Sequence, residues 1–426
     1  MPGRGPTRRR FLEAATGGAA ALLWPAPLDA LAAQLRRTER QEYWELVRGA
    51  FLIPGDRVYL NVGTLGAQPR AVVDAVVEHT RRVAMSLPPA LDWDDVKGRL
   101  AALLHCDAAG LVFPRNTTEG MSFVANGLEL DAGAEILTTD HEHVGGLCPW
   151  QLAAARRGLR LRVLPLPPAA ADDGQIVDLF RRAFTRRTRV VSVSHVNFTT
   201  GRIMPVQDIV RLCRERGVIA VIDGAHPPGL MTVDIARVDP DFYASSPHKW
   251  LLAPQGTGFL WLREEWRTRL WPTLASGGWD DLSLGAQRFN HLGTLDESRL
   301  AGLVAALRFR DAVGGDRIEE RIRALRARLI AGLGGIAGLR IVSPVDDAHG
   351  AGMVSFGIDG VDSARLQQRL GAVQTGDGGT VGVRTRVIGE YGYGWMRLSP
   401  HIWNSPEEVD RVTGWIAELA PGLRER

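Results

Sequence analysis

Residues 245–250 read SSPHKW after a short apolar run, and residues 221–226 read VIDGAH at the end of a second apolar run. The first stretch contains Lys249, and the second contains Asp223, which lies 26 residues earlier in the chain. Alone, a lysine is usually a solvated surface group, and an acid after an apolar run is often a turn residue. A hydroxyl and an imidazole in the first stretch, at Ser246 and His248, and an imidazole in the second, at His226, change that interpretation. The sequence therefore predicts a binding site at the ends of two strands.

Lys249 and Asp223 are the two kinds of side chain that pyridoxal phosphate chemistry requires: a lysine that forms a Schiff base and an acid that keeps the pyridinium nitrogen protonated. An anion beside that nitrogen lets the ring act as an electron sink for a carbanion at a substrate α-carbon. Lys249 would first hold the cofactor and later, as a free amine, remove the α-proton as general base. We therefore expect a pyridoxal phosphate enzyme with Lys249 as its catalytic residue.

Two further groups fit such a site. Residues 116–120, NTTEG, follow a strand and open a helix, where hydroxyls and backbone N–H groups can bind a phosphate, although an ordinary helix N-cap explains the same letters. Ser246 and His248 lie within one turn of Lys249 and supply more donors. A substrate carboxylate is best met by a planar guanidinium, and Arg397 is the candidate because an unpaired charge in its apolar strand would be costly. A structural salt bridge is the alternative for Arg397.

Short strands rich in Val, Ile and Leu alternate with helices through the first two thirds of the chain. This alternation indicates an α/β fold with a mostly parallel sheet covered by helices on both faces. Ligands bind beyond the carboxyl ends of such strands, and Asp140, Asn197, Asp223 and Lys249 each follow one. The expected strands are 57–61, 111–113, 135–138, 161–164, 190–195, 218–222, 242–245 and 258–262. The expected helices are 34–48, 70–86, 119–128, 149–157, 176–184, 205–216, 300–313 and 316–333.

The composition is that of a globular enzyme, with 426 residues, of which 45% are hydrophobic and 23% charged. The net charge of +3 gives no indication of a nucleic-acid partner. The three cysteines are too scattered for a disulfide framework or a zinc site and are expected to be buried apolar residues. The expected organisation is a leader over residues 1–33, an N-terminal segment over 34–65, a large cofactor-binding domain over 66–285 and a smaller α+β domain over 286–426.

The N-terminus has the order of an export signal. TRRRFL at residues 7–12 precedes a small-residue apolar stretch and then ALA at residues 30–32, which fits a cleavage site. This order resembles a twin-arginine signal, and the apolar stretch is too short for a stable membrane span of about 20 residues. A basic tail is the alternative. Since twin-arginine export carries folded proteins, a cofactor could be loaded first, and we expect a periplasmic or extracellular enzyme.

Beyond these residues, the chain resembles class V aminotransferase-fold enzymes of fold type I, closest to the isopenicillin N epimerase-like group and related to cysteine desulfurases. The resemblance covers residues 59–409. Its markers are YLNVG at 59–63, RNTTEG at 115–120, DHEH at 140–143, SHVNFTTG at 194–201, DGAH at 223–226, SPHK at 246–249 and MRLS at 396–399.

The resemblance implies roles for individual residues. The phosphate ligands would be Thr117, Thr118, Ser246 and His248. His143 would stack on the cofactor ring, Asp223 would pair with the ring nitrogen, and His226 would lie near the ring hydroxyl. The substrate would be bound by Asn61 and Arg397. Thr294 would reach the phosphate of a neighbouring subunit, which implies a homodimer with shared active sites. No metal site is expected.

Two departures from the desulfurase pattern limit the resemblance. Residues 380–388 contain Arg384 and Arg386 but no cysteine, which argues against persulfide formation. Phe198 stands where desulfurases use an asparagine, and Asn197 comes one place earlier.

Several reactions therefore stay open: epimerisation, transamination, and β-elimination of the C–S lyase type. Epimerisation needs a second acid or base, for which His143 is the candidate, and elimination of an anionic group could use Arg384 or Arg386. The alternatives in other classes are a catalytically inactive secreted binding protein and, from His141 and His143, a zinc hydrolase, although no helical zinc motif supports the latter.

Overall fold

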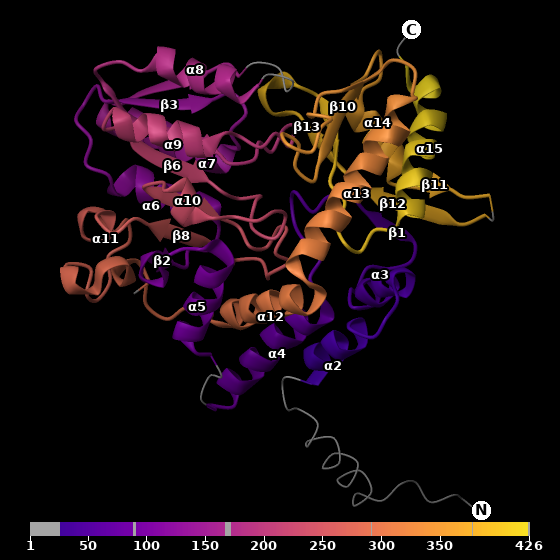
Figure 1. Ribbon diagram of the computed structural model, residues 1–426, viewed down its shortest axis with the longest axis horizontal. Coiled ribbons are helices and arrows are strands. Elements are labelled where there is room, and N and C mark those ends of the chain that lie inside the picture. Colours follow the sequence, from indigo (N-terminus) through magenta and orange to yellow (C-terminus); the bar gives the residue numbers. More distant parts are fainter. Residues whose placement is uncertain (1–25, 88–90, 167–171, 291, 377, 425–426) are drawn as a thin grey trace, which may run out of the picture.

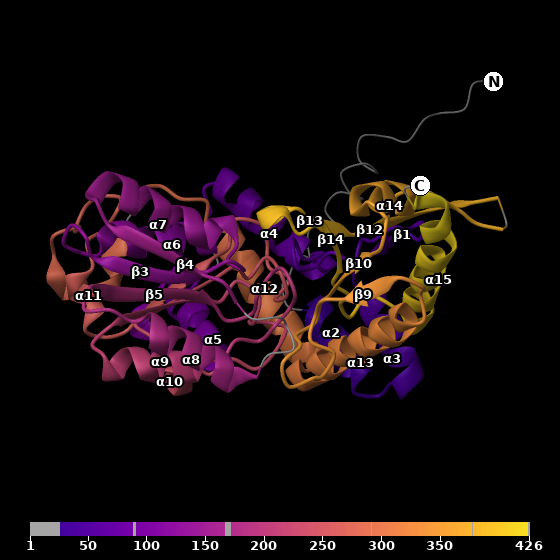
Figure 2. The same ribbon diagram turned by 90° about the horizontal axis from the view of Figure 1, so that it is seen from above.

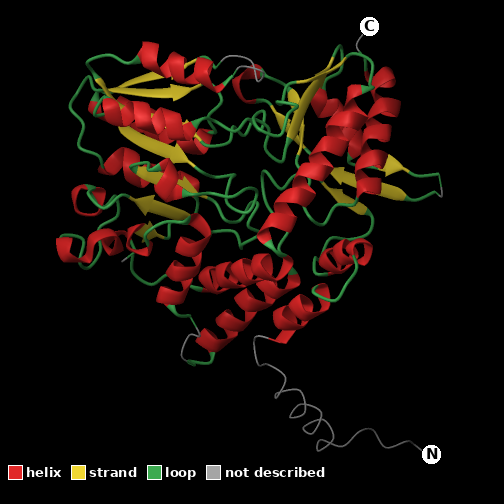
Figure 3. Ribbon diagram, in the orientation of Figure 1, coloured by secondary structure: helices red, strands yellow, loops and turns green. Residues whose placement is uncertain are grey.

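The structure is a computed structural model that describes residues 26–87, 91–166, 172–290, 292–376 and 378–424. Figures 1 and 3 show a helix-covered sheet on one side of the molecule and smaller sheets with long helices on the other. The strands are β1 Arg57–Tyr59, β2 Leu111–Val112, β3 Glu135–Thr139, β4 Arg160–Leu164, β5 Thr188–Ser194, β6 Ile219–Asp223, β7 Phe242–Ser245, β8 Phe259–Leu262, β9 Leu339–Ile341, β10 Val354–Ile358, β11 Val373–Gln374, β12 Thr380–Arg384, β13 Arg386–Ile388 and β14 Trp395–Leu398.

The α-helices are α2 Ala26–Leu35, α3 Arg40–Gly49, α4 Arg70–Ala84, α5 Trp93–Leu104, α6 Thr117–Gly127, α7 Val144–Arg157, α8 Asp173–Ala183, α9 Val206–Glu215, α10 Ile235–Val238, α11 Trp266–Arg269, α12 Ser298–Val313, α13 Gly315–Gly334, α14 Ser363–Leu370 and α15 Pro406–Leu423. The 3₁₀ helices are η1 Ala108–Gly110, η2 Leu282–Phe289 and η3 Glu390–Gly392.

The larger sheet has seven strands in the order β2-β8-β7-β6-β5-β3-β4. The strands β4, β3, β5, β6 and β7 run parallel, whereas β8 runs antiparallel to both of its neighbours, β7 and β2. The mostly parallel sheet predicted from the sequence is thereby confirmed. Because the carboxyl ends of β3, β5, β6 and β7 lie at one edge, the polar residues that follow these strands are brought to the same side of the sheet.

Helices cover both faces of this sheet, as Figure 2 shows. Neighbouring strand residues point to opposite faces, so Val191 and Ile222 pack with α8, α9 and α12, whereas Val190 and Val221 pack with α6 and α7. All four side chains are fully or almost fully buried. Burial on both faces explains why these strands are continuous apolar runs rather than alternating ones.

The C-terminal part contains a four-stranded antiparallel sheet, β13-β14-β10-β9, and a three-stranded sheet, β1-β12-β11. Residues of both sheets share one buried cluster with α13, α14 and α15. β1 comes from the N-terminal segment and pairs in parallel with β12, so distant parts of the chain build this unit together. The boundaries predicted at residues 65 and 285 stay a prediction.

The N-terminal helices pack beside α4 and α12 (Figure 1). The single helix expected over residues 34–48 is wrong, because the chain turns after Leu35 and α3 begins at Arg40. The Thr38 hydroxyl donates to the Gln34 carbonyl at 2.8 Å, which stabilises that turn. α2 also overlaps the segment assigned to the leader, and its Leu28 and Leu35 are buried. Most of the leader, residues 1–25, lies outside the described residues.

The start of α7 also differs from the expectation. The sequence places a helix start at Pro149, but α7 begins at Val144, with Pro149 inside it and His143 as its N-cap. The His143 imidazole accepts the Gly145 N–H at 3.1 Å, a cap that proline-based reasoning overlooks. The structure therefore places the beginning of this helix, rather than its second turn, beside residues 140–143.

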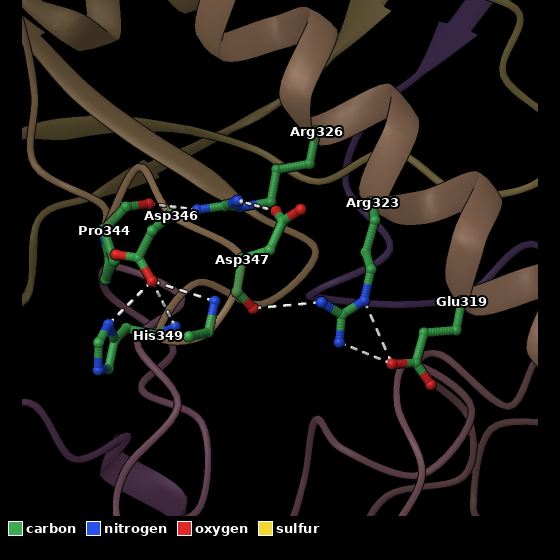
Figure 4. Close-up of polar contacts among 8 residues, drawn as sticks. Glu319, Arg323, Arg326, Pro344, Asp346, Asp347 and His349 are labelled. Atoms are coloured by element: carbon green, nitrogen blue, oxygen red, sulfur yellow. Dashed lines mark hydrogen bonds and ion pairs between the residues drawn. The ribbon is translucent and has the colours of Figure 1, made fainter.

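A loop before β10 is held by charged contacts from α13 (Figure 4). Arg326 is fully buried, pairs with Asp347 at 3.0 Å and donates to the Pro344 carbonyl. In the same loop, the His349 carbonyl accepts the Ile203 N–H at 2.8 Å. The loop thus joins the C-terminal unit to the turn that follows β5.

Of the cysteines, Cys213 is buried as expected, but Cys148 is exposed on α7 and Cys106 is partly exposed, which corrects the expectation of burial for these two. Within the described ranges, no helix has the length and apolar character needed to cross a bilayer.

Candidate active site

A cavity of about 230 Å³ lies at the carboxyl edge of the large sheet, where it meets the C-terminal unit. Nine of the residues predicted from the sequence line it: Thr117, Thr118, His143, Asp223, His226, Ser246, His248, Lys249 and Arg397. The other lining residues are Gly63, Thr64, Asn116, Gly145, Ser194, Val196, Phe198, Ala225 and Arg386. Side chains that are distant in the sequence therefore meet in one place, although their individual roles stay predictions.

The start of α6 forms a cluster of donors at one wall. The Asn116 side chain caps the helix by accepting the Glu119 N–H at 3.0 Å, so the N-cap interpretation holds for this residue. Thr117 behaves differently: its hydroxyl lies 2.7 Å from the Ser246 hydroxyl, and both line the cavity. A helix N-terminus with hydroxyl groups beside it is a favourable place for an anion such as a phosphate.

His248 contributes to this wall in a more restricted way. Its Nδ1 lies 3.2 Å from the Thr257 carbonyl and must donate to it, which leaves Nε2 without a proton in the neutral ring. Burial, with the nearby Lys249, lowers the pKa of His248 to about 4. A hydrogen bond from Nε2 to a phosphate therefore requires the doubly protonated ring, which a neighbouring dianion would favour.

Asp223 ends β6 and is buried beneath the beginning of α7. Its Oδ1 accepts the Ala225 N–H at 2.9 Å, while Oδ2 faces Gly146 so closely that a Cβ there would lie 2.8 Å from it. Burial raises the pKa of Asp223, whereas the Lys249 ammonium lowers it. An acid in this position gains from a cationic partner, as a protonated ring nitrogen would be.

Lys249 follows β7, and its amine contacts a histidine whose tautomer is fixed. The buried Trp250 indole N–H donates to His226 Nδ1 at 3.0 Å, so the neutral His226 carries its proton on Nε2. That Nε2 lies 3.4 Å from Lys249 Nζ, and the amine must therefore accept. Burial lowers the pKa of Lys249 to about 8, with Asp223 opposing and the Arg397 charge adding to the effect. The unprotonated amine is thus more populated near neutral pH than in an ordinary lysine.

His143 stands over the cavity with its ring edge-on to Phe198, at a centroid distance of 5.1 Å. Since Nδ1 accepts the Gly145 N–H, Nε2 carries the proton in the neutral ring. Burial and the cations Lys249, Arg386 and Arg397 lower the pKa of His143 to about 3. A neutral ring of this kind is suited to stacking.

Arg397 is 1% exposed on β14, and no carboxylate among the described residues lies within ion-pair distance of it. It donates to the Phe198 carbonyl at 2.7 Å and to the Thr64 hydroxyl at 3.3 Å, while its Nε has no partner. Burial and the adjacent Arg386 lower the pKa of Arg397 to about 9. The salt-bridge alternative is therefore not what the structure shows, and a buried cation with open donors fits a ligand carboxylate.

Three residues named from the sequence stand outside the cavity wall. Asn61 is buried and accepts the Thr64 hydroxyl at 2.9 Å, so it supports a lining residue from behind. Thr294 is exposed, away from the lining residues, and its predicted role requires a second subunit. Asn197 is 1% exposed and its Nδ2 faces the Met204 sulfur at 3.6 Å, while Phe198 lines the cavity instead.

Sequence reasoning missed Glu142, which is fully enclosed next to the site. It accepts the Thr139 hydroxyl at 2.6 Å and the Ser194 hydroxyl at 2.5 Å. Burial raises the pKa of Glu142 to about 7, and the neighbouring Asp223 acts in the same direction. An acid between two histidines in a polar tetrapeptide gave no sign of burial in the sequence.

These features fit pyridoxal phosphate at both of its ends. The donors at the start of α6 suit the phosphate, Asp223 Oδ2 suits the ring nitrogen, and Lys249 Nζ suits the aldehyde. The absence of a side chain at Gly145 matters as well, because a Cβ there would come within 2.3 Å of the Thr118 hydroxyl oxygen. The wall is thus closed to any larger residue at that point.

Comparisons with known proteins agree with this geometry. The sequence profile of the aminotransferase class V family matches residues 90–412. The isopenicillin N epimerase of Streptomyces clavuligerus is 31% identical over 405 residues, which cover 88% of this chain and 98% of that protein.

Two solved structures are also similar. The apo structure of a cysteine desulfurase from Thermococcus onnurineus has a TM-score of 0.77 and 27% identity, covering 89% of this chain and 98% of that one. The cystine C–S lyase C-DES has a TM-score of 0.74 and 25% identity, covering 84% and 97%. The profile match spans more than half of the chain, and the cavity has the groups that the cofactor needs. The chain belongs to the aminotransferase class V family and is a pyridoxal 5′-phosphate-dependent enzyme.

Proposed function

We propose that this protein is an exported enzyme that acts at the α-carbon of an amino acid or amino-acid-like substrate, with Lys249 as the residue that holds the cofactor. One observation carries the proposal: the Lys249 amine shares a cavity with an acid for the ring nitrogen and with the buried guanidinium of Arg397, which pairs with no acid in the described parts of the chain. When bound, the cofactor supplies an aldehyde that captures the substrate amine and a ring that accepts the electron pair left at the α-carbon.

The residues of the chain would divide the remaining work. Arg397 would bind the substrate carboxylate through its open donors and so fix the orientation of the α-carbon. Asp223 would hold a proton on the ring nitrogen. Once released from the cofactor, Lys249 would take the α-proton, and its lowered pKa of about 8 keeps a useful fraction of the amine unprotonated near neutral pH.

His226 would assist Lys249 rather than compete with it. Because the Trp250 indole directs the His226 proton onto Nε2, this histidine donates toward Nζ and stabilises the free amine. A histidine in the other tautomer would accept a proton from the lysine and favour the ammonium form instead. The indole therefore supports the protonation state that general-base chemistry requires.

The step after proton removal defines the reaction class. Epimerisation or transamination at the α-carbon is the first candidate, and the relationship to the Streptomyces epimerase supports it. β-Elimination is the second candidate, favoured by one observation: within the described residues, no cysteine lines the cavity, so persulfide formation on a catalytic cysteine has no residue to use. The similar C–S lyase structure agrees with this alternative.

Absorption spectroscopy of the purified protein tests the proposal. Wild type and Lys249→Ala are loaded with pyridoxal phosphate and mixed with L- and D-amino acids, with and without a keto acid. A visible band that is lost in the variant and shifted by amino acids supports the proposal. Loss of substrate chirality, formation of a new amino acid, and release of a keto acid with ammonia distinguish epimerase, aminotransferase and lyase. A protein that binds ligands normally without cofactor would instead revive the binding-protein alternative.

Export and dimerisation are parts of the same proposal. The arginine pair at residues 8 and 9 supports export, and replacing both by lysine should keep the enzyme in the cytoplasm in a cell-fractionation experiment. The exposed position of Thr294 suits a contact with a second subunit. A homodimer in light scattering, with cofactor affinity that falls in Thr294→Ala, is expected, and a monomer of full affinity would contradict shared active sites.

A further inference from the structure

Two arginines face one another across the strands that close the cavity. In the antiparallel pairing of β13 and β14, Arg386 lies opposite Arg397, and both side chains line the cavity. Like charges at opposite positions repel one another and destabilise a sheet. The two guanidiniums also share one acceptor, the Thr64 hydroxyl, at 3.5 Å and 3.3 Å. The close approach of the two guanidiniums is therefore unfavourable unless negatively charged groups lie beside them.

The protein itself supplies only part of that negative charge. Glu390 pairs with Arg386, and both side chains are 23% exposed, so this ion pair supplies one carboxylate beside two guanidiniums. The Nε of Arg386 and the Nε of Arg397 are both buried without a hydrogen-bond partner. Among the described residues that line the cavity, Asp223 is the acid present, against Lys249 and the two arginines. The cavity is therefore short of anions.

The proposed function accounts for some of this excess positive charge. The cofactor aldehyde would bind the Lys249 amine, and the substrate α-carboxylate would neutralise the Arg397 charge. Arg386 then has only Glu390, which belongs to the 3₁₀ turn η3 beyond the cavity wall. A ligand anion that enters the cavity can replace Glu390 on Arg386 through a charge-assisted contact.

We propose that the substrate carries a second acidic group on its side chain and that Arg386 binds this group in place of Glu390. The inference rests on the proposed function, and it assigns the substrate class to amino acids with an anionic side chain. Arg386 would act as the residue that determines specificity, with Phe198 beneath its guanidinium at 5.8 Å.

Arg384 provides a matched control. It lies two residues earlier at the end of β12, is exposed and lines a different cavity, beside Tyr59 and Leu52. Of the two arginines that the sequence offered for an anionic group, the structure brings only Arg386 to the active site. The same substitution at either position removes one positive charge, so a general electrostatic effect can be separated from a specific contact.

The test measures binding of matched ligands to the enzyme loaded with pyridoxal phosphate. Aspartate and asparagine, glutamate and glutamine, and 2-aminoadipate and its amide form pairs that differ in one charge, and both enantiomers are used. Dissociation constants are taken from the shift of the visible band. At least one acid should bind about tenfold more tightly than its amide, as expected for a charge-assisted contact. Arg386→Gln should reduce the ratio to about one, whereas Arg384→Gln should preserve it.

Two further variants and a second readout complete the test. Glu390→Gln should tighten binding of the acid, because the ligand no longer competes for Arg386, and Arg386→Lys keeps the charge if the glutamine variant does not fold. In protein without cofactor, glutarate should raise the melting temperature more than butyrate does, and Arg386→Gln should abolish that difference. Equal binding of acids and amides, or an unchanged preference in Arg386→Gln, would overturn this inference alone. Failure of every amino acid to shift the band would overturn the proposed function as well.

Discussion

Replacing Lys249 with methionine should make the cofactor-free protein more stable at neutral pH. The Lys249 side chain is half-buried and faces the cavity, and desolvation holds its pKa at about 8, below the ordinary 10.5, despite the nearby Asp223 carboxylate. Methionine has a similar length and shape but no charge, so it removes the penalty of burying an ammonium group while keeping most of the apolar contacts.

The magnitude follows from the two pKa values. The unfolded chain binds a proton on this lysine up to about pH 10.5, whereas the folded protein releases it near pH 8, so stability of the wild type rises between those values. The penalty is complete below pH 8 and absent above 10.5. A pKa difference of one unit corresponds to about 1.4 kcal/mol, so the penalty for burying the ammonium group amounts to about 3 kcal/mol.

Urea unfolding of both cofactor-free proteins between pH 6 and pH 11, followed by tryptophan fluorescence, measures the difference. The variant should be more stable by up to about 3 kcal/mol at pH 7, and the two proteins should converge toward pH 11. The convergence serves as an internal control, because both side chains are then neutral. A difference independent of pH, or a wild type that is more stable at pH 7, would refute the reasoning about the buried amine.

Three other changes test the surrounding contacts. Trp250→Phe leaves the buried His226 Nδ1 without its donor, which should lower the free energy of unfolding by about 1–3 kcal/mol. The His226 proton should then no longer be restricted to Nε2, as ¹⁵N NMR of labelled histidine would show. Asp223→Asn should lower the Lys249 pKa further, because the carboxylate raises it. ¹³C NMR of methylated lysines measures this pKa. A higher pKa in the variant would argue against the placement of Asp223 beside Lys249. In the wild type, the free energy of unfolding should fall as the pH rises from about 4.5 to about 7, because the folded protein keeps the Glu142 proton up to about pH 7. Glu142→Gln should remove this fall, which urea unfolding measures. An unchanged pH profile would show that this acid is not buried as described.

The fold and the meeting of the main candidate residues in one cavity could be predicted because both follow from local patterns. The apolar strands of the parallel sheet carry their own signal, and Asp223 ends one such strand while Lys249 lies shortly after another. Once the strands are known to be parallel, the convergence of these residues on one edge follows from topology. The helix start at Val144 escaped prediction because an imidazole cap is uncommon and Pro149 suggested a later start.

Contacts that depend on long-range pairing could not be predicted. The position of Arg386 opposite Arg397 depends on the pairing of β13 with β14, which the turn at residues 389–394 allows through left-handed backbone at Tyr391 and Gly392. The indole bond of Trp250 to His226 depends on two loops meeting. These contacts determine the tautomer of His226 and the charge balance of the cavity. The sequence therefore indicates which residues form the site better than it indicates their protonation states.

The central claim is that Lys249 holds the cofactor, and the sequence allows a direct measurement because Lys97 is the only other lysine. The enzyme loaded with pyridoxal phosphate is reduced with borohydride, which makes the bond between cofactor and lysine permanent, and is then digested for peptide mass spectrometry. The account predicts a pyridoxyl phosphate group on the peptide that contains Lys249 and none on the Lys97 peptide. Modification of Lys97 alone, or of neither lysine in protein that retains its visible band, would contradict it.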